Sequence, residues 1–159
     1  MRGATVAPGR VTGRRVYIDS SALLKRSVDE GESEAVEDVL ERHVDDEDVL
    51  VSSSLAWIEV GRALRSRLDG KGQEVINEAI EDALSGIAER PVAADVVSIA
   101  RRIGPSVLRS LDAIHLATAV LVDADVMITY DDRLVVAARH NDVTVSAPGS
   151  KELRDQGPG

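Results

Sequence analysis

Four acidic side chains are the groups in this sequence with the clearest capacity for chemistry, and each comes from a different predicted element. They are Asp19, Glu59, Asp112 and Asp131. Carboxylates that share one pocket repel each other, unless a divalent cation bound between them removes the repulsion. Magnesium and similar hard cations prefer such oxygen ligands. If the fold brings the four acids together, they predict a metal site.

Asp19 and the pair Asp131-Asp132 follow short apolar segments, which predict buried strands that deliver these acids to one edge of a sheet. In open α/β sheets, ligands bind at the edge formed by the carboxyl ends of the strands. Each acid has a simpler alternative as a helix cap or as a favourable charge at a helix N-terminus. Once Asp19 is taken as a ligand, capping is expected to fall to Ser20 or Ser21.

Asp112 lies in the apolar segment 111–122, where few other polar side chains occur. Because burying an unpaired carboxylate is costly, Asp112 either caps the helix in its first turn or faces a cation or a hydrogen-bonded pocket. His115 follows three residues later and falls near the same helix face. We interpret it as a packed, hydrogen-bonded core residue.

Glu59 lies in a predicted helix that follows a strand and ends near residue 68. Its side chain can pair with Arg62 on a solvated stripe of that helix, which is its simplest interpretation when it is taken alone. Apolar residues of the same helix, including Leu55, Ile58 and Leu64, are expected to contact the core.

Short apolar segments alternate with amphipathic ones along the chain. We expect strands at residues 15–19, 48–52, 91–93, 126–129 and 143–145. Helices are expected at residues 20–27, 32–43, 54–68, 73–88, 95–102, 111–122 and 133–140, with Asp95 as a cap. Short strands separated by helices predict a doubly wound α/β domain, with three layers in α/β/α order and a mainly parallel central sheet.

Length and composition predict one domain. The chain has 159 residues, of which 43% are hydrophobic, and this is enough for a proper core. We place the folded domain at residues 14–147, between a flexible lead-in at residues 1–13 and a polar tail at residues 148–159. The chain has no cysteine and its three histidines lack metal-ligand spacing, so a bound metal is expected to be a hard cation held by oxygen.

The net charge of −9 argues against a protein that coats nucleic acid through a general positive field. Arginines outside the acidic stretch at residues 29–48 still allow a local basic rim around an acidic pocket. Aromatic residues make up only 2% of the chain, which disfavours RNA binding on stacking platforms. No apolar run approaches the roughly 20 residues of a membrane span, and we expect a cytoplasmic protein.

Four stretches of the sequence, by their order and spacing, resemble the PIN-domain ribonucleases, and most closely their VapC-type toxin branch. The stretches are residues 18–23 (IDSSAL), Glu59 in the helix after the second strand, residues 111–119 (LDAIHLATA) and residues 129–134 (TYDDRL). The first and third carry most of the resemblance, which covers residues 15–147.

The resemblance implies a metal-dependent endoribonuclease that acts as the toxin of a toxin–antitoxin pair. Its acidic metal site would comprise Asp19, Glu59, Asp112 and Asp131, with Ser20, Thr129 and Asp132 as supporting neighbours. The doubled Asp131-Asp132 leaves open which carboxylate faces the metal, although the Thr-x-Asp spacing favours Asp131. The family further implies Mg²⁺ or Mn²⁺, single-stranded or loop RNA as substrate, a homodimer and a VapB-type antitoxin, with DNA contacted only through the antitoxin.

Two other classes of acidic-pocket protein fit less well. Among phosphotransfer enzymes, a phosphatase needs a second aspartate where this chain has Ser21, and a receiver domain needs a lysine late in the sheet, whereas Lys151 lies in the tail. A non-enzymatic metal-dependent binding module needs a serine at the position of Leu23. Both alternatives therefore fail at a named residue.

Overall fold

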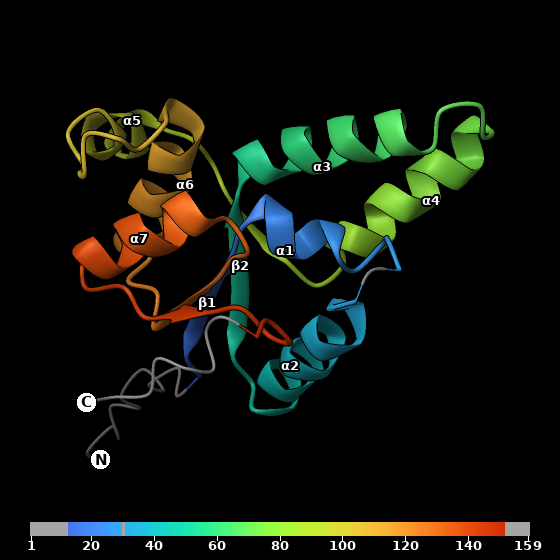
Figure 1. Cartoon of the computed structure of the whole chain (residues 1–159), viewed down its shortest axis with the longest axis horizontal. Helices are drawn as coiled ribbons and strands as arrows, with labels where there is room; N and C mark the ends of the chain where they lie inside the picture. Colours follow the sequence, from blue (N-terminus) through green and yellow to red (C-terminus); the bar gives the residue numbers. More distant parts are fainter. Residues whose placement is uncertain (1–12, 30, 152–159) are drawn as a thin grey trace, which may run out of the picture.

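The computed structural model describes residues 13–29 and 31–151, which contain a five-stranded sheet (Figure 1). Its strands are β1 (Arg15–Ile18), β2 (Val49–Ser53), β3 (Ala88–Arg90), β4 (Val126–Ile128) and β5 (Val145–Ser146). They lie in the order β3-β2-β1-β4-β5, and every neighbouring pair is parallel. The predicted parallel α/β fold is therefore confirmed. The predicted lead-in, apart from Gly13, and most of the predicted tail lie outside the described residues.

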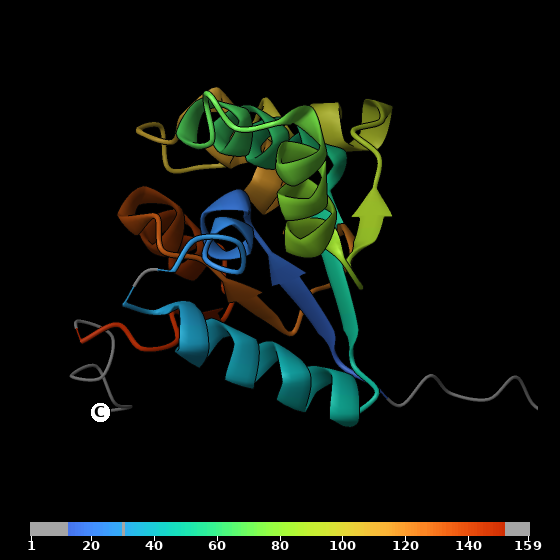
Figure 2. The same ribbon diagram turned by 90° about the vertical axis from the view of Figure 1, so that its right-hand side faces the viewer.

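Helices cover both faces of the sheet (Figure 1, Figure 2). They are α1 (Ser20–Leu24), α2 (Ser33–Asp45), α3 (Ser54–Arg67), α4 (Gln73–Leu84), α5 (Ala94–Ala100), α6 (Ser110–Leu121) and α7 (Asp132–His140). Helices α1 to α4 enclose one hydrophobic core cluster, and α6 and α7 enclose a second on the opposite face. Within the described ranges, every helix is too short or too polar to cross a membrane.

Strand β1 supplies both cores, because its side chains alternate between the two faces of the sheet. Val16 and Ile18 are buried in the first cluster, whereas Tyr17 is buried in the second. Strand β4 repeats this pattern, with Ile128 in the first cluster and Met127 in the second. Strands that are buried on both faces belong inside a parallel sheet, and β1 and β4 lie there.

The sheet reverses its winding between β1 and β4. From β1 the chain proceeds outward through β2 to β3, then returns to β4 on the other side of β1 and continues to β5. The N–H of Asp19 donates to the carbonyl of Ile128 at 3.2 Å, so the residues that follow β1 and β4 lie side by side. Ligands of open α/β sheets bind at such a reversal point. The fold therefore places Asp19 and Thr129 where a ligand site is expected.

Strand β3 comes earlier in the chain than the strand predicted at residues 91–93. Pro91 has no N–H to donate to the sheet, so the strand ends at Arg90. The preceding helix α4 also ends earlier than predicted. Gly86 adopts a positive φ of 75° shortly after that helix, a conformation that glycine reaches at little cost and that turns the chain into β3.

The last strand and helix α5 also differ from the sequence predictions. The strand comprises Val145–Ser146 in place of residues 143–145. Helix α5 has Ala93 at its N-cap, so Asp95 lies inside the first turn and is not the predicted cap. The Asp95 carboxylate instead pairs with Arg90, the residue that ends β3.

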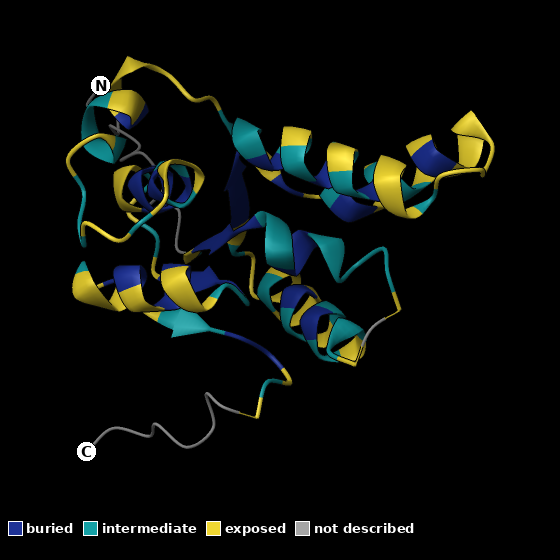
Figure 3. Cartoon of the chain, turned by 45° about the horizontal axis from the view of Figure 1, so that its top comes forward, coloured by how far each residue is buried: buried dark blue, intermediate teal, exposed yellow. Residues whose placement is uncertain are grey.

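Helix α3 turns a different face to the core than predicted. Ile58 is 63% exposed and Leu55 is only partly buried, whereas Ala56 and Val60 are fully buried. Leu64 is buried as expected. The helix packs against α1 and α4 besides the sheet, and Figure 3 shows exposed positions recurring along its outer face. Its neighbours, which the sequence does not reveal, therefore set the buried stripe.

Asp48 joins the starts of β1 and β2 through a side chain that is 4% exposed. Its oxygens accept the N–H of Arg14 at 2.6 Å and lie 2.7 Å from Nδ1 of His43. Burial opposes ionisation, but these contacts outweigh it and hold the pKa of Asp48 below its ordinary value. We expect Asp48→Asn to lower the unfolding free energy by about 1–2 kcal/mol at neutral pH, measured by urea denaturation.

The cost of Asp48→Asn should depend on pH in a fixed direction. A carboxyl whose pKa is lower in the folded state stabilises the protein above its unfolded pKa, about 3.9, and this contribution disappears as the pH falls through the folded pKa. The gap between wild type and variant should therefore close on acidification. The exposed neighbour Asp46 supplies the control, since Asp46→Asn should leave the unfolding free energy close to that of wild type at every pH. A gap for Asp48→Asn that persists in strong acid would contradict the assignment.

Candidate active site

Asp19 follows β1 and is buried at the N-cap of α1. Its Oδ1 accepts the hydroxyl of Ser21 at 2.7 Å and the N–H of Ala22 at 3.1 Å. Its Oδ2 accepts the hydroxyl of Thr129 at 2.8 Å. Burial raises the pKa of Asp19, while the charge of His115 and these donors oppose the rise. Both oxygens of the carboxylate are thus held in place at the carboxyl end of β1.

The capping role remains with Asp19, so the prediction that it falls to Ser20 or Ser21 is wrong. Asp19 has an extended backbone (φ −83°, ψ 172°) and α1 begins directly after it, which puts its side chain over the first turn. The serine hydroxyls bind the acids instead. Ser20 donates to Oε2 of Glu59 at 2.5 Å, and Ser21 donates to Asp19. Ser21, which the sequence suggested only as a helix cap, is thus a direct neighbour of Asp19.

Thr129 links the residues that follow β1 and β4. Its hydroxyl donates to Asp19 and accepts the N–H of Asp131 at 3.1 Å. Asp131 caps α7, and its Oδ1 accepts the N–H of Arg133 at 2.9 Å. Asp132 is exposed in the first turn of α7. Of the two adjacent acids, Asp131 is therefore the one connected through Thr129 to Asp19.

Glu59 lies in the second turn of α3 and faces α1 and α6. Its Oε2 accepts the hydroxyl of Ser20 and lies 2.7 Å from Nε2 of His115. Burial alone would raise the pKa of Glu59, but the hydrogen bonds from His115 and Ser20 outweigh burial and lower it. Among the described residues, no ion pair joins Glu59 to Arg62, so the solvated-stripe interpretation is wrong.

Asp112 lies in the first turn of α6, and its Oδ2 is buried without a hydrogen-bond partner among the described residues. The N-cap of α6 is Arg109, so Asp112 is not the helix cap. Burial and then the charge of Asp131 raise the pKa of Asp112. The charges of Arg133, His115 and Arg109 oppose this rise. A buried carboxylate oxygen without a partner is what a cation-facing or pocket-facing position predicts.

His115 is 2% exposed, which agrees with its interpretation as a packed core residue, but its ring also reaches the acidic side chains. Its Nδ1 lies 2.7 Å from the hydroxyl of Tyr17, and the two rings meet edge to face at 6.0 Å. The three-residue spacing from Asp112 was the available sequence signal. The contact with Glu59, 56 residues earlier in the chain, had no local signal.

Residues 16–140 match the PIN domain family. The chain is also similar to Ribonuclease VapC46 of Mycobacterium tuberculosis, with 42% identity over 135 residues that cover 84% of this chain and 97% of the relative. The chain belongs to the PIN-domain family, in its ribonuclease VapC branch. Ribonuclease VapC47 of the same species is 32% identical over 137 residues, covering 85% of this PIN-domain chain and 98% of the relative.

Two solved structures share the PIN fold. VapBC2 from Rickettsia felis, bound to a DNA fragment from its promoter, has a TM-score of 0.66 at 11% identity and covers 83% of this chain and 97% of that chain. VapC20 from Mycobacterium tuberculosis, a sarcin-ricin loop cleaving toxin, has a TM-score of 0.60 at 15% identity. The match covers 77% of this chain and 94% of that chain. At these identities, the likeness establishes the fold of the PIN domain.

The acids of this PIN domain fit a hard divalent cation by their chemistry. Asp112 offers a buried oxygen without a partner, and Glu59 is kept ionised by its hydrogen bonds. Carboxylate oxygens are the ligands that Mg²⁺ and Mn²⁺ prefer. In the described part of the chain, no three acidic or histidine side chains are already arranged to hold a metal ion. The donors are chemically suited to the ion, but the described structure does not gather three of them around one point.

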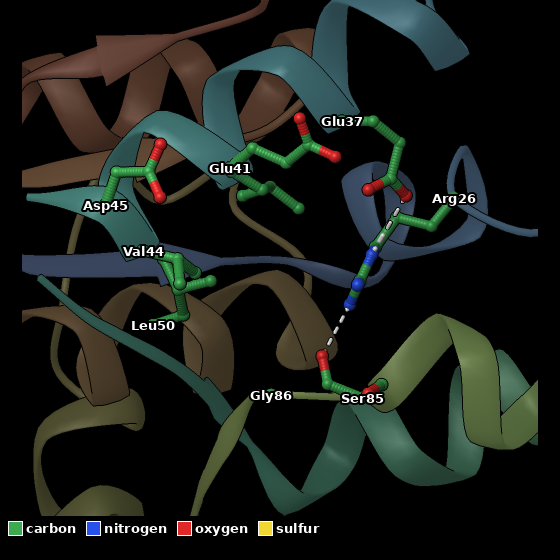
Figure 4. A pocket seen from close by; sticks show the side chains of 9 residues that line it. Arg26, Glu37, Glu41, Val44, Asp45, Leu50, Ser85 and Gly86 are labelled. Carbon is green, nitrogen blue, oxygen red and sulfur yellow. Dashed lines mark hydrogen bonds and ion pairs between the residues drawn. The ribbon is translucent and has the colours of Figure 1, made fainter. Parts of the chain in front are cut away.

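A separate hollow of about 230 Å³ lies between α2 and the turn after α4 (Figure 4). Acidic side chains of α2 line it, but Glu37 pairs with Arg26 at 3.2 Å. Arg26 also donates to the carbonyl of Ser85 at 2.8 Å. Among the described residues, Asp112 alone has a buried side-chain oxygen without a partner, and it lies outside this hollow. The end of β1 is therefore the better candidate for an active site.

Proposed function

We propose that this PIN domain is a Mg²⁺-dependent endoribonuclease and acts as the toxin of a toxin–antitoxin pair. The observation that carries the proposal is the buried Oδ2 of Asp112, which has no hydrogen-bond partner among the described residues. The negative charge of Asp131 further raises the pKa of this carboxyl group. Carboxylates can share one pocket in their charged form only with a cation. The names of the relatives, Ribonuclease VapC46 and Ribonuclease VapC47, support RNA as the substrate.

The chain's own acids would hold the cation, and hydroxyl groups would orient the acids. The proposed metal ligands are Asp19, Glu59, Asp112 and Asp131. Thr129 and Ser20 would fix two of them through the hydrogen bonds described above. When bound, Mg²⁺, or Mn²⁺ in its place, supplies charge stabilisation at the phosphate and lowers the pKa of a water molecule. Asp132, which is exposed, would stay outside this group of ligands.

Arginines beside the acids would bind the RNA backbone. The charges of Arg133 and Arg109 act on Asp112, so both guanidinium groups lie within electrostatic range of the proposed ligands. Guanidinium groups match the geometry of phosphate oxygens. They would offset locally the net charge of −9, which otherwise repels RNA. The substrate would be single-stranded or loop RNA held mainly through its phosphates.

The proposed partner of the toxin is a VapB-type antitoxin. An antitoxin peptide could place an arginine among the four acids and displace the cation, while an apolar segment docks nearby. The toxin would form a homodimer and would contact DNA only through the antitoxin. VapBC2, which shares this fold, was solved with a DNA fragment from its promoter. A toxin that cleaves RNA would act in the cytoplasm, where its substrate lies.

Sequencing the 5′ ends of RNA produced with Mg²⁺ tests the proposed activity, with wild type compared with Asp19→Asn. Asparagine caps helices about as well as aspartate, so the variant keeps the N–H of Ala22 paired but loses the charge that a cation needs. We expect wild type to produce new ends that depend on Mg²⁺, and the variant to produce none above the metal-free level. Identical ends from both proteins at the same rate would sink the assignment of Asp19.

A further inference from the structure

A chain of hydrogen bonds runs from the backbone of β2 through the core to Glu59. The N–H of Ser53 donates to the hydroxyl oxygen of Tyr17 at 3.2 Å. That hydroxyl lies 2.7 Å from Nδ1 of His115, and Nε2 of His115 lies 2.7 Å from Oε2 of Glu59. Ser53, Tyr17 and His115 are all buried. The roles proposed so far for the metal ligands do not involve this series of hydrogen bonds.

The chemistry of Glu59 sets the direction of the last hydrogen bond. An ionised carboxylate only accepts hydrogen bonds, so Nε2 of His115 carries the hydrogen and donates it. The hydroxyl of Ser20 donates to the same oxygen, Oε2. Both donors therefore engage one oxygen of Glu59, Oε2, and neither engages its Oε1.

The other end of the His115 ring is fixed as well. Tyr17 contacts Nδ1 and also packs edge to face on the ring, with an interplanar angle of 72°. Tyr17 lies in β1, directly before the strand's last residue, and is itself anchored to β2 through Ser53. A free glutamate side chain has several rotamers, and a rigid donor removes that freedom before a ligand arrives.

We propose that His115 is a positioning residue for the metal site, which holds Glu59 through Nε2 so that its Oε1 is available to the cation. The inference rests on the proposed metal-dependent function. Because α6 carries both His115 and Asp112, one helix would supply a ligand and orient a second ligand from α3. Partners that orient metal ligands in this way typically change metal affinity by about 10–100-fold when they are removed.

Two substitutions of His115 by amide side chains distinguish the contribution of Nε2 from that of Nδ1. The amide of glutamine reaches the place of Nε2, whereas the shorter amide of asparagine reaches only the place of Nδ1. We expect His115→Gln to retain Mn²⁺ affinity within a few-fold of wild type, and His115→Asn to lose about 10–100-fold. Calorimetric titration of the metal-free proteins with Mn²⁺ measures this directly, without recourse to RNA cleavage.

Thr118 supplies the matched control on the same helix. It is buried, three residues after His115, and its hydroxyl donates to the carbonyl of Ile114 rather than to one of the acids. Thr118→Val should lower stability without changing Mn²⁺ affinity. A double-mutant cycle with Glu59→Gln adds a further readout, because a residue that acts only through Glu59 should have no effect once Glu59 is neutral.

The outcomes separate this inference from the proposed function. Equal Mn²⁺ affinities for wild type and His115→Asn would overturn the inference, and so would equal losses for the asparagine and glutamine variants. If His115→Asn does not fold, Tyr17→Phe replaces it, since it keeps the ring and removes only the anchor. Tyr17→Phe should then weaken Mn²⁺ binding several-fold, and unchanged binding would overturn the inference. A wild type that binds no Mn²⁺ would overturn the metal site itself.

Discussion

Replacement of Asp112 by asparagine should slow RNA cleavage about a thousandfold, because it removes a proposed ligand of the cation, and a bound cation supplies several kcal/mol of charge stabilisation in the transition state. The same change should make the metal-free protein more stable. The Oδ2 of Asp112 is buried without a partner among the described residues, and the charge of Asp131 acts on it. The neutral amide removes this repulsion. We therefore expect the free energy of unfolding to rise by about 1 kcal/mol and the Tm to rise by roughly 2–4 °C.

The stability gain of Asp112→Asn should appear in a defined pH window. Because burial and Asp131 raise the pKa of Asp112, the folded protein holds the proton to a higher pH than the unfolded chain. Wild type therefore loses stability as the pH rises from the ordinary range of aspartate through the raised pKa. The advantage of the variant should develop across that window and persist at neutral pH. Thermal melts across the pH range, in chelator, measure it.

Magnesium should reverse the order of stability. A cation that binds only the folded state raises the Tm of wild type, and the variant should gain much less. Asp123→Asn is the control, since Asp123 follows α6 and its side chain is 91% exposed. Neither its cleavage rate nor its response to Mg²⁺ should change. Wild-type cleavage by Asp112→Asn would remove Asp112 from the proposed metal site.

The parallel sheet and the ends of its central strands were predictable from local sequence. Residues 16–18 are apolar and β-favouring, and a strand buried on both faces needs no more information than that. An acid directly after such a strand must lie at its carboxyl edge, which is where Asp19 lies. The same logic placed Thr129 and Asp131. The position of each residue at a strand end follows from its neighbours in the sequence, and the parallel sheet brings these strand ends to one edge.

Contacts between distant elements were not predictable in this way. Glu59 has Arg62 one turn later in the sequence, yet its observed partners are Ser20 and His115, from two other elements. Ile58 fits an apolar stripe of α3, but the packing of α3 on α1 and α4 leaves it exposed. In both cases, several helix faces satisfied the local pattern, and only the tertiary arrangement selects one.

Leu116 should be among the most costly positions in the fold. Its side chain is fully buried in the core cluster between α6, α7 and the sheet, where it packs with Tyr17, Met127 and Leu134. Truncation to alanine removes buried methyl groups and leaves a cavity, since packed cores relax only partly. We expect Leu116→Ala to lower the unfolding free energy by about 3–4 kcal/mol.

The same helix offers a control for Leu116→Ala. Leu121 is 37% exposed at the end of α6, so Leu121→Ala should cost less than about 1 kcal/mol. Urea denaturation distinguishes the two, with a lower midpoint and an unchanged slope expected for Leu116→Ala. Equal losses at both positions would show that the core around α6 is not close-packed. Because Leu116 follows His115 and lies one turn from Asp112, a loosened α6 should also weaken Mn²⁺ binding, whereas Leu121→Ala should leave it unchanged.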